Sequence, residues 1–249
     1  MIELFDIQTG FGGANRAEAY IVTADEWLQT MTQLEIGRAL VRFEPDALDV
    51  DCVMANEIVF AACQGRSDLV PCPVALPATG GDVPPEDEQL DGFIRRGAGA
   101  ALIRPGHDDW QFLPFVYGNL LNAFAVRRLP VYCLERYLPV LQIAELAGRY
   151  PDLPIILAGV SYRSQRTFVP LLQTYANVHL SIGSNFTIHR GLEHMVGLGL
   201  GAQLLFGTGF PAAEPMMAIT QLIYADLTDA QKADIGARNF ERLLAGVIR

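Results

Sequence analysis

The sequence has few basic residues and no long apolar segment, and both absences limit its function. Its 249 residues include 18 Lys or Arg against 28 Asp or Glu, a formal net charge of −10. So acidic a surface argues against binding nucleic-acid phosphates or anionic membrane. No apolar run reaches the roughly 18 residues of a membrane-spanning helix, and the chain opens without the basic region of a secretory signal. We therefore expect a cytoplasmic protein with neither nucleic-acid nor membrane partners.

The cysteines also lack the spacing that is typical of disulfide-bonded or zinc-binding cysteines. There are four of them, Cys52, Cys63, Cys72 and Cys133, and none forms a CxxC pair. Their surroundings are mostly apolar, which is typical of reduced core residues in a cytosolic protein. The pattern favours neither a disulfide framework nor a zinc knuckle.

What the sequence does contain is a regular alternation of strand-like and helix-like segments. Thr23 with Glu26 and Thr228 with Gln231 form capping boxes that mark helix starts. The strand-like segments are apolar throughout, as expected for strands buried on both faces of a parallel sheet. The predicted strands are Ile2–Ile7, Arg38–Phe43, Leu69–Leu76, Ala100–Arg104, Val131–Leu134, Ile155–Ala158, Val178–Ile182 and Leu204–Gly207.

Eight such strands with intervening helices predict a single (β/α)8 TIM barrel spanning residues 1–249, because this is the usual size of that fold. The structural rival is an open doubly wound sheet, which would carry a GxGxxG turn after its first strand. The segment that starts at Gly10 lacks that motif, since Asn15 occupies the position of its third glycine. No linker or internal repeat divides the chain.

Several segments at predicted strand ends resemble the amidohydrolase-2 family of metal-dependent hydrolases and decarboxylases. The residues that carry this resemblance are DIQTGFG at 6–12, LPVYCL at 129–134, YPDLPIILAG at 150–159, LLFGTGFP at 204–211 and RNFERLL at 238–244. The resemblance covers essentially the whole chain and implies an α/β amidohydrolase-like barrel. Because related barrels are often dimers, it also makes a homodimer the default expectation.

The positions at which this family binds its metal are occupied here by residues that do not match the motif. The family's four histidines and one aspartate fall on Gln8, Gly10, Leu134, Gly159 and Gly209. None of the four histidines, His107, His179, His189 and His194, lies at these positions. A zinc-type site needs three or four convergent ligands. We therefore expect that the inherited metal site is lost and that no cofactor is bound. His107 with Asp108 is either a remaining ligand pair or simply a loop histidine beside a solvated carboxylate.

Polar residues at the predicted strand ends suggest a different use of the barrel mouth. They are Gln8, Arg42, Arg104, His107, Glu135, Arg136, Arg163, Asn185 and Thr208. The predicted ligand-binding set is Gln8, Arg42, Arg104, Glu135 and Arg163, with Glu135 and His107 as candidate catalytic groups. Leu134 and Phe210 are expected to fill space left open at Gly159 and Gly209.

Arg104 and Glu135 follow neighbouring predicted strands, so a salt bridge between them is expected. That pair is either purely structural or a clamp in which Glu135 orients Arg104 to grip a small carboxylate in a two-pronged geometry. The arginines could instead only bridge loop carboxylates such as Asp108 and Asp109.

Two hypotheses about function follow. The first is a non-catalytic homologue of metal-dependent hydrolases that binds a small anion. The second is a metal-independent, lactonase-like hydrolase that acts on a small carboxylate substrate. An acid or base that projects from the strand ends would favour the second, since fold alone does not establish function.

Overall fold

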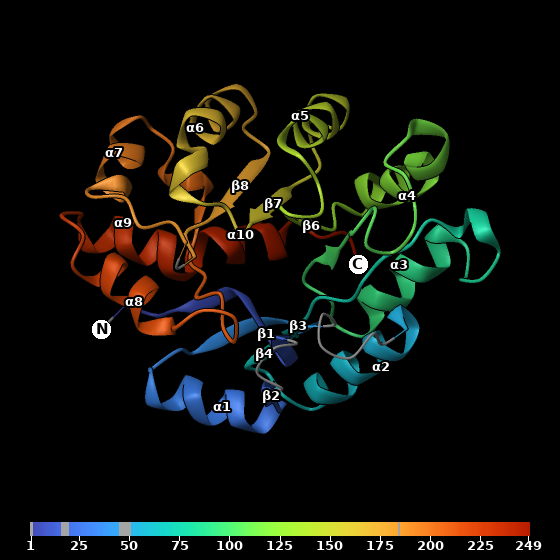
Figure 1. Ribbon diagram of the computed structural model, residues 1–249, viewed down its shortest axis with the longest axis horizontal. Helices are drawn as coiled ribbons and strands as arrows, with labels where there is room; N and C mark the ends of the chain where they lie inside the picture. Colours follow the sequence, from blue (N-terminus) through green and yellow to red (C-terminus); the bar gives the residue numbers. More distant parts are fainter. Residues whose placement is uncertain (1, 16–19, 45–50, 184) are drawn as a thin grey trace.

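The computed structural model describes residues 2–15, 20–44, 51–183 and 185–249. Strands lie at the centre of the molecule and helices surround them (Figure 1). The strands are β1 Phe5–Asn15, β2 Tyr20–Val22, β3 Arg38–Glu44, β4 Leu69–Pro71, β5 Ala101–Leu102, β6 Val131–Leu134, β7 Ile155–Ala158, β8 Val178–Ser181 and β9 Leu204–Leu205.

The α-helices lie outside the strands. They are α1 Ala24–Gln33, α2 Cys52–Cys63, α3 Glu86–Arg95, α4 Pro114–Arg127, α5 Val140–Arg149, α6 Gln165–Thr174, α7 Gly191–Gly197, α8 Pro215–Ile223, α9 Asp229–Ala233 and α10 Asn239–Ala245. Both predicted capping boxes are confirmed, with Thr23 and Thr228 as the N-cap residues of α1 and α9. Among the described residues, no helix combines the length and apolarity needed to cross a membrane.

Eight parallel strands close into a barrel. The strand order is β1-β3-β4 in one group and β5-β6-β7-β8-β9 in the other, all pairings being parallel. A parallel bridge between Val74 and Leu102 joins β4 to β5. On the other side, the Ile7 amide donates to the Phe206 carbonyl at 3.0 Å and joins β1 to the segment after β9. The predicted (β/α)8 barrel is therefore confirmed, and the rival open sheet is excluded.

The first strand differs from the prediction. Ile2–Ile7 was expected, whereas β1 starts at Phe5 and continues to Asn15. Its second half pairs in parallel with β3 as far as Gly12. It also pairs in antiparallel fashion with β2, a strand outside the barrel. The polar residues and glycines after Ile7 end the apolar run, so the local pattern gave no sign of pairing that depends on distant segments. By contrast, β6 and β7 have the predicted bounds.

Two apolar layers stabilise the barrel. Inside it, side chains from alternate strand positions, such as Ile7, Leu102 and Ile156, form one buried cluster. Phe240 of α10 packs at the end of this cluster where β1 begins, with its ring edge-on to Phe5 at a centroid distance of 4.8 Å. The larger cluster fills the space between strands and helices. Each large side chain buried in this way contributes roughly 1.5–3 kcal/mol.

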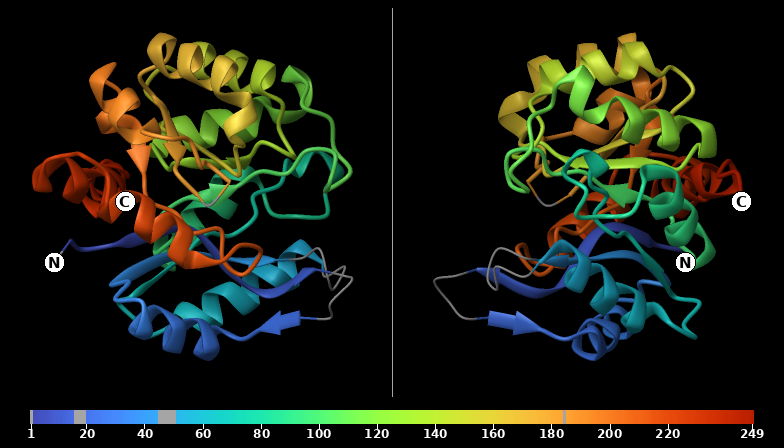
Figure 2. Two further views of the ribbon diagram at one scale, coloured as in Figure 1. Left: turned by 60° about the vertical axis from the view of Figure 1, so that its left-hand side comes forward. Right: turned by 90° about the vertical axis from the view of Figure 1, so that its right-hand side faces the viewer.

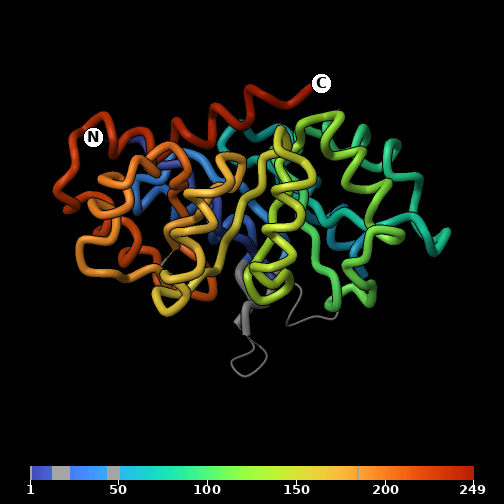
Figure 3. The backbone as a smooth tube through the Cα atoms, turned by 90° about the horizontal axis from the view of Figure 1, so that it is seen from above, coloured from blue at the N-terminus to red at the C-terminus, as the bar shows by residue number. Residues whose placement is uncertain are grey.

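The two ends of the barrel differ in what they carry. Both chain termini lie at one end, and β2 lies at the other (Figure 2). The view from above places the N and C labels on the same side of the molecule (Figure 3). Because β1 runs from the first end to the second, the carboxyl ends of all the parallel strands lie at the β2 end. This end, called the mouth below, is where (β/α)8 barrels carry their sites.

Candidate functional site

A cavity of about 190 Å³ opens at the mouth of the barrel. Its lining residues are Gln8, Arg42, Leu134, Arg136, Gly159, Asn185, Gly209, Ala212 and Ala213. Four of the five motif-matched positions therefore meet here. The fifth, Gly10, is a backbone-pairing position whose amide donates to the Phe210 carbonyl at 3.1 Å. We call this space the mouth cavity.

Gln8 forms part of the floor of the mouth cavity. Its side chain is only 8% exposed, and its Oε1 accepts a hydrogen bond from the Ser181 hydroxyl at 2.8 Å. The Gly159 amide donates to the same oxygen at 3.4 Å. The Gln8 amide group is thus held from two neighbouring strands, β8 and the end of β7.

Two arginines give the mouth cavity its positive charge. Arg42, on β3, is buried, and its Nη1 donates to the Thr9 carbonyl at 3.2 Å and to the Tyr132 hydroxyl at 3.4 Å. Its guanidinium carbon also lies 5.6 Å from the centroid of the Tyr132 ring. Arg136, just after β6, is exposed. Guanidinium groups in a concave site focus positive potential even in an acidic protein.

Thr208, expected at the mouth, is instead buried in the barrel wall beside Asp6. The Asp6 carboxylate accepts hydrogen bonds from two backbone N–H groups, that of Thr208 at 2.9 Å and that of Gln8 at 3.0 Å, and from the Thr208 hydroxyl at 2.5 Å. Burial raises the pKa of Asp6 to about 6, although these hydrogen bonds oppose the shift. This network fixes the backbone of Gln8 against the segment after β9.

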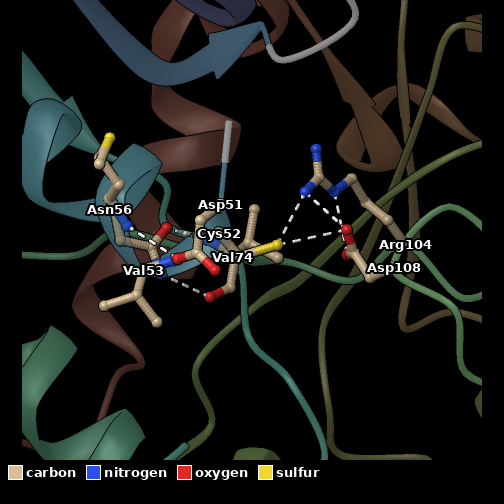
Figure 4. Close-up of polar contacts among 8 residues, drawn as sticks. Asp51, Cys52, Val53, Asn56, Val74, Arg104 and Asp108 are labelled. Atoms are coloured by element: carbon tan, nitrogen blue, oxygen red, sulfur yellow. Dashed lines mark hydrogen bonds and ion pairs between the residues drawn. The ribbon is translucent and has the colours of Figure 1, made fainter. Parts of the chain in front are cut away.

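The expected salt bridge between Arg104 and Glu135 is wrong. Arg104 instead pairs with Asp108, with Nε–Oδ2 at 3.0 Å and Nη2–Oδ1 at 2.7 Å (Figure 4). Its Nη2 also lies 3.1 Å from the sulfur of Cys52. The side chains of Arg104 and Asp108 are 2% and 6% exposed. A turn after β5 returns the chain so that the residue four positions later, not the neighbouring strand, supplies the carboxylate. The alternative expectation, that Arg104 bridges the loop carboxylate of Asp108, is thereby confirmed.

Three other predicted site residues lie outside the mouth cavity. Glu135 accepts a hydrogen bond from the Ser164 hydroxyl at 2.8 Å. His107 is exposed, and its ring centroid lies 5.1 Å from that of Tyr137. Arg163 is also exposed, and its Nε donates to the Tyr162 hydroxyl at 3.3 Å. His107 and Arg104 line a separate space of about 500 Å³ that is rich in aspartates.

The filling of the mouth differs in part from expectation. Leu134, Gly159 and Gly209 line the mouth cavity as expected. Phe210 does not fill it, because its ring stacks on Trp27 of α1 with a centroid distance of 4.3 Å. The short side chains of Ala212 and Ala213 line the cavity instead, so the mouth remains open.

The described residues contain no cluster of three or more His, Cys, Asp or Glu side chains that could hold a metal ion. His179 lies near the start of β8, at the end away from the mouth, and burial lowers its pKa to about 4.

All four cysteines are free. Burial and the neighbouring Asp108 raise the pKa of the Cys52 thiol to about 11, so this sulfur is a poor nucleophile at neutral pH.

The sequence matches the amidohydrolase family profile over residues 22–245. The chain therefore belongs to the amidohydrolase-2 family, as its motifs suggested. No curated protein matches it.

Solved structures with the same fold include three decarboxylases. The 2,6-dihydroxybenzoate decarboxylase from Rhizobium is 16% identical with a TM-score of 0.73, and the match covers 98% of this chain and 99% of that one. The 5-carboxyvanillate decarboxylase from Sphingomonas paucimobilis is 12% identical with a TM-score of 0.72, covering 98% and 99%. The dihydroxybenzoic acid decarboxylase from Polaromonas, solved with manganese and 2-nitroresorcinol, is 15% identical with a TM-score of 0.73, covering 98% and 97%. Such identities support the shared fold alone.

Proposed function

We propose that this protein binds a small carboxylate in the mouth cavity. The observation that carries the proposal is the lining of that cavity, which includes two arginines, Arg42 and Arg136, and two residues with side-chain amides, Gln8 and Asn185. Guanidinium groups bind carboxylates in a matching planar geometry and keep their charge at any physiological pH. The cavity thus offers charge and hydrogen-bond donors to an anion.

The size of the cavity restricts the ligand to a small molecule. Pockets for drug-sized ligands measure roughly 300–1,000 Å³, whereas the mouth cavity measures about 190 Å³. The decarboxylases that share this fold are named for aromatic carboxylic acids. Both facts support a small organic acid, with Leu134 and Ala213 as the apolar contacts for its carbon skeleton.

The donors of the mouth cavity do not fit the divalent metal that one of these decarboxylases carries. Leu134, Gly159 and Gly209 supply no ligand atom from a side chain, and two arginines would repel a cation. The Gln8 oxygen already accepts two hydrogen bonds. We infer that guanidinium charge, rather than a metal ion, meets the charge of the ligand in this chain, and we derive no reaction step through a metal.

The alternative of metal-independent hydrolysis receives less support. Such a reaction needs an acid or base within hydrogen-bond reach of the substrate. Glu135 and His107, the two candidates, are not among the described residues that line the mouth cavity. The lining of the mouth cavity therefore supports a binding function better than a hydrolytic one.

Isothermal titration calorimetry with acetate, benzoate and 2,6-dihydroxybenzoate tests the proposal. We expect at least one acid to bind, and Arg42→Met and Arg136→Met each to weaken it about tenfold or more, since hydrogen bonds to charged groups contribute about 1.5–3 kcal/mol. Arg163→Met is the matched control, because Arg163 is exposed and outside the cavity, and it should change Kd less than twofold. The proposal fails if no acid binds, or if both cavity variants bind as tightly as the wild type. Arg136 is exposed, so its variant is informative even if Arg42→Met unfolds the protein.

A further inference from the structure

The side chain of Gln8 lies in a space that glycines keep free. A Cβ atom at Gly183 would lie 2.5 Å from Gln8 Oε1, and one at Gly207 would lie 2.6 Å from Gln8 Cβ. Both distances are shorter than real contacts allow, so neither position tolerates a side chain without a shift of Gln8. Gly159 and Gly209 border the same amide from the cavity side. The chain around the mouth thus accommodates this one side chain in a defined position.

Hydrogen bonds also fix which end of the Gln8 amide points into the cavity. The Gly159 amide can only donate, so the atom that faces it at 3.4 Å is the side-chain oxygen. The Ser181 hydroxyl donates to the same oxygen at 2.8 Å. The Gly159 contact determines the O/N assignment that an amide otherwise leaves open, whereas a hydroxyl such as that of Ser181 can donate or accept. The Nε2 group consequently lies on the side of Gly209, 3.5 Å from where its Cβ would be and next to the lining of the cavity.

We infer that Gln8 selects carboxylates with a second acceptor oxygen on the neighbouring carbon, such as 2-oxo and 2-hydroxy acids. This inference rests on the proposed carboxylate site. The arginines hold the carboxylate, and the Gln8 Nε2 group donates to the second oxygen. Ser181 is a positioning residue, because its hydroxyl keeps the amide oxygen turned away from the ligand.

Matched acid pairs that differ in one oxygen test this inference. Calorimetry compares pyruvate with propionate, and mandelate with phenylacetate. A neutral hydrogen bond contributes about 0.5–1.5 kcal/mol, so the wild type should bind the oxygen-bearing member of at least one pair about three- to tenfold more tightly. If neither member of any pair binds, the carboxylate site itself fails. If both members of each pair bind equally, the site stands and the role of Gln8 is refuted.

Variants separate selection from simple structural support. Gln8→Met removes the donor and should reduce the ratio of the two affinities to about one while the plain acid still binds. Ser181→Ala leaves the Gln8 donor in place but frees the amide to turn, so the ratio should fall while affinity for propionate or phenylacetate changes less than twofold. An unchanged ratio in folded Gln8→Met refutes the inference. If that variant does not fold, an unchanged ratio in Ser181→Ala refutes it, since the orientation of the amide would then have no effect on selection.

Discussion

Two buried arginines at the mouth of the barrel have opposite environments. Arg42 faces the mouth cavity together with Arg136 and two amide side chains. Arg104, at the end of a nearby strand, is bound by Asp108 through two hydrogen bonds and contacts Cys52 (Figure 4). Arg42 lines a cavity, whereas Arg104 forms an ion pair with a carboxylate of its own loop.

The comparison teaches that a basic residue at a strand end is not by itself a ligand site. At Arg104 the charge is met by Asp108, although Nη1 of this guanidinium has no hydrogen-bond partner among the described residues. Arg42 donates hydrogen bonds to two neutral oxygens, the Thr9 carbonyl and the Tyr132 hydroxyl. These contacts help to hold its guanidinium at the wall of the mouth cavity. Variants beside Arg104 and variants beside the mouth cavity should therefore differ in their effects on protein stability and on carboxylate binding.

The largest effect is expected from breaking the pair on the Arg104 side. Asp108→Asn should lower the free energy of unfolding by about 3–5 kcal/mol, because it leaves a buried guanidinium without its counter-charge. Urea denaturation at pH 7 measures this loss. Asp109→Asn is the matched control, since Asp109 is an exposed neighbour, and it should change stability by less than about 0.5 kcal/mol.

The same variant tests the contrast directly. Carboxylate affinity at the mouth cavity should change less than twofold in folded Asp108→Asn, because Arg104 does not line that cavity. The contrast between Arg42 and Arg104 is refuted if Asp108→Asn lowers the free energy of unfolding by less than about 1 kcal/mol. It also fails if freeing Arg104 strengthens carboxylate binding.

A smaller effect, dependent on pH, is expected on the other side of the mouth. Burial raises the pKa of Asp6 to about 6 from an ordinary 3.8. Between these values the folded protein keeps a proton that the unfolded chain releases, so stability from Asp6 is present below about pH 4 and is lost as the pH rises through 6. The shift corresponds to about 3 kcal/mol.

Asp6→Asn isolates this contribution, since an amide does not titrate in this range. Urea denaturation between pH 4 and pH 7 should show the wild type losing about 3 kcal/mol relative to the variant. Parallel pH profiles of the two proteins would mean that Asp6 is not the buried carboxyl group that responds to pH here.

Local sequence signals predicted much of the barrel but little of this contrast. The capping boxes at Thr23 and Thr228 and the bounds of β6 and β7 follow from residues close together in the chain. The order of strands and helices was enough to predict barrel closure.

The details of the mouth depend on contacts that no local pattern contains. Phe210 turns from the cavity because Trp27, far away in the sequence, offers a face for stacking. The pairing of Arg104 depends on the turn that brings Asp108 back, in which Asp109 adopts a positive φ of 54°. Residue type placed Gln8 and Arg42 at the mouth and offered both Glu135 and Asp108 as partners of Arg104, and only the folded chain decides for Asp108.

The smallest effects are expected from two glycine substitutions that test how closely the Gln8 side is packed. Gly207→Ala would place a Cβ 2.6 Å from the Cβ of Gln8. That atom is fixed to the backbone and cannot swing away, so overpacking should cost about 1–3 kcal/mol. Gly118, within α4, is the matched control, since its Cβ would meet no heavy atom of the described residues within 4 Å apart from its chain neighbours and the backbone of its own helix. Gly118→Ala should therefore gain about 0.5–1 kcal/mol from helix propensity. Urea denaturation of both variants decides the point: if Gly207→Ala is as stable as Gly118→Ala, the space around Gln8 is loose and its amide is not held in the orientation on which ligand selection depends.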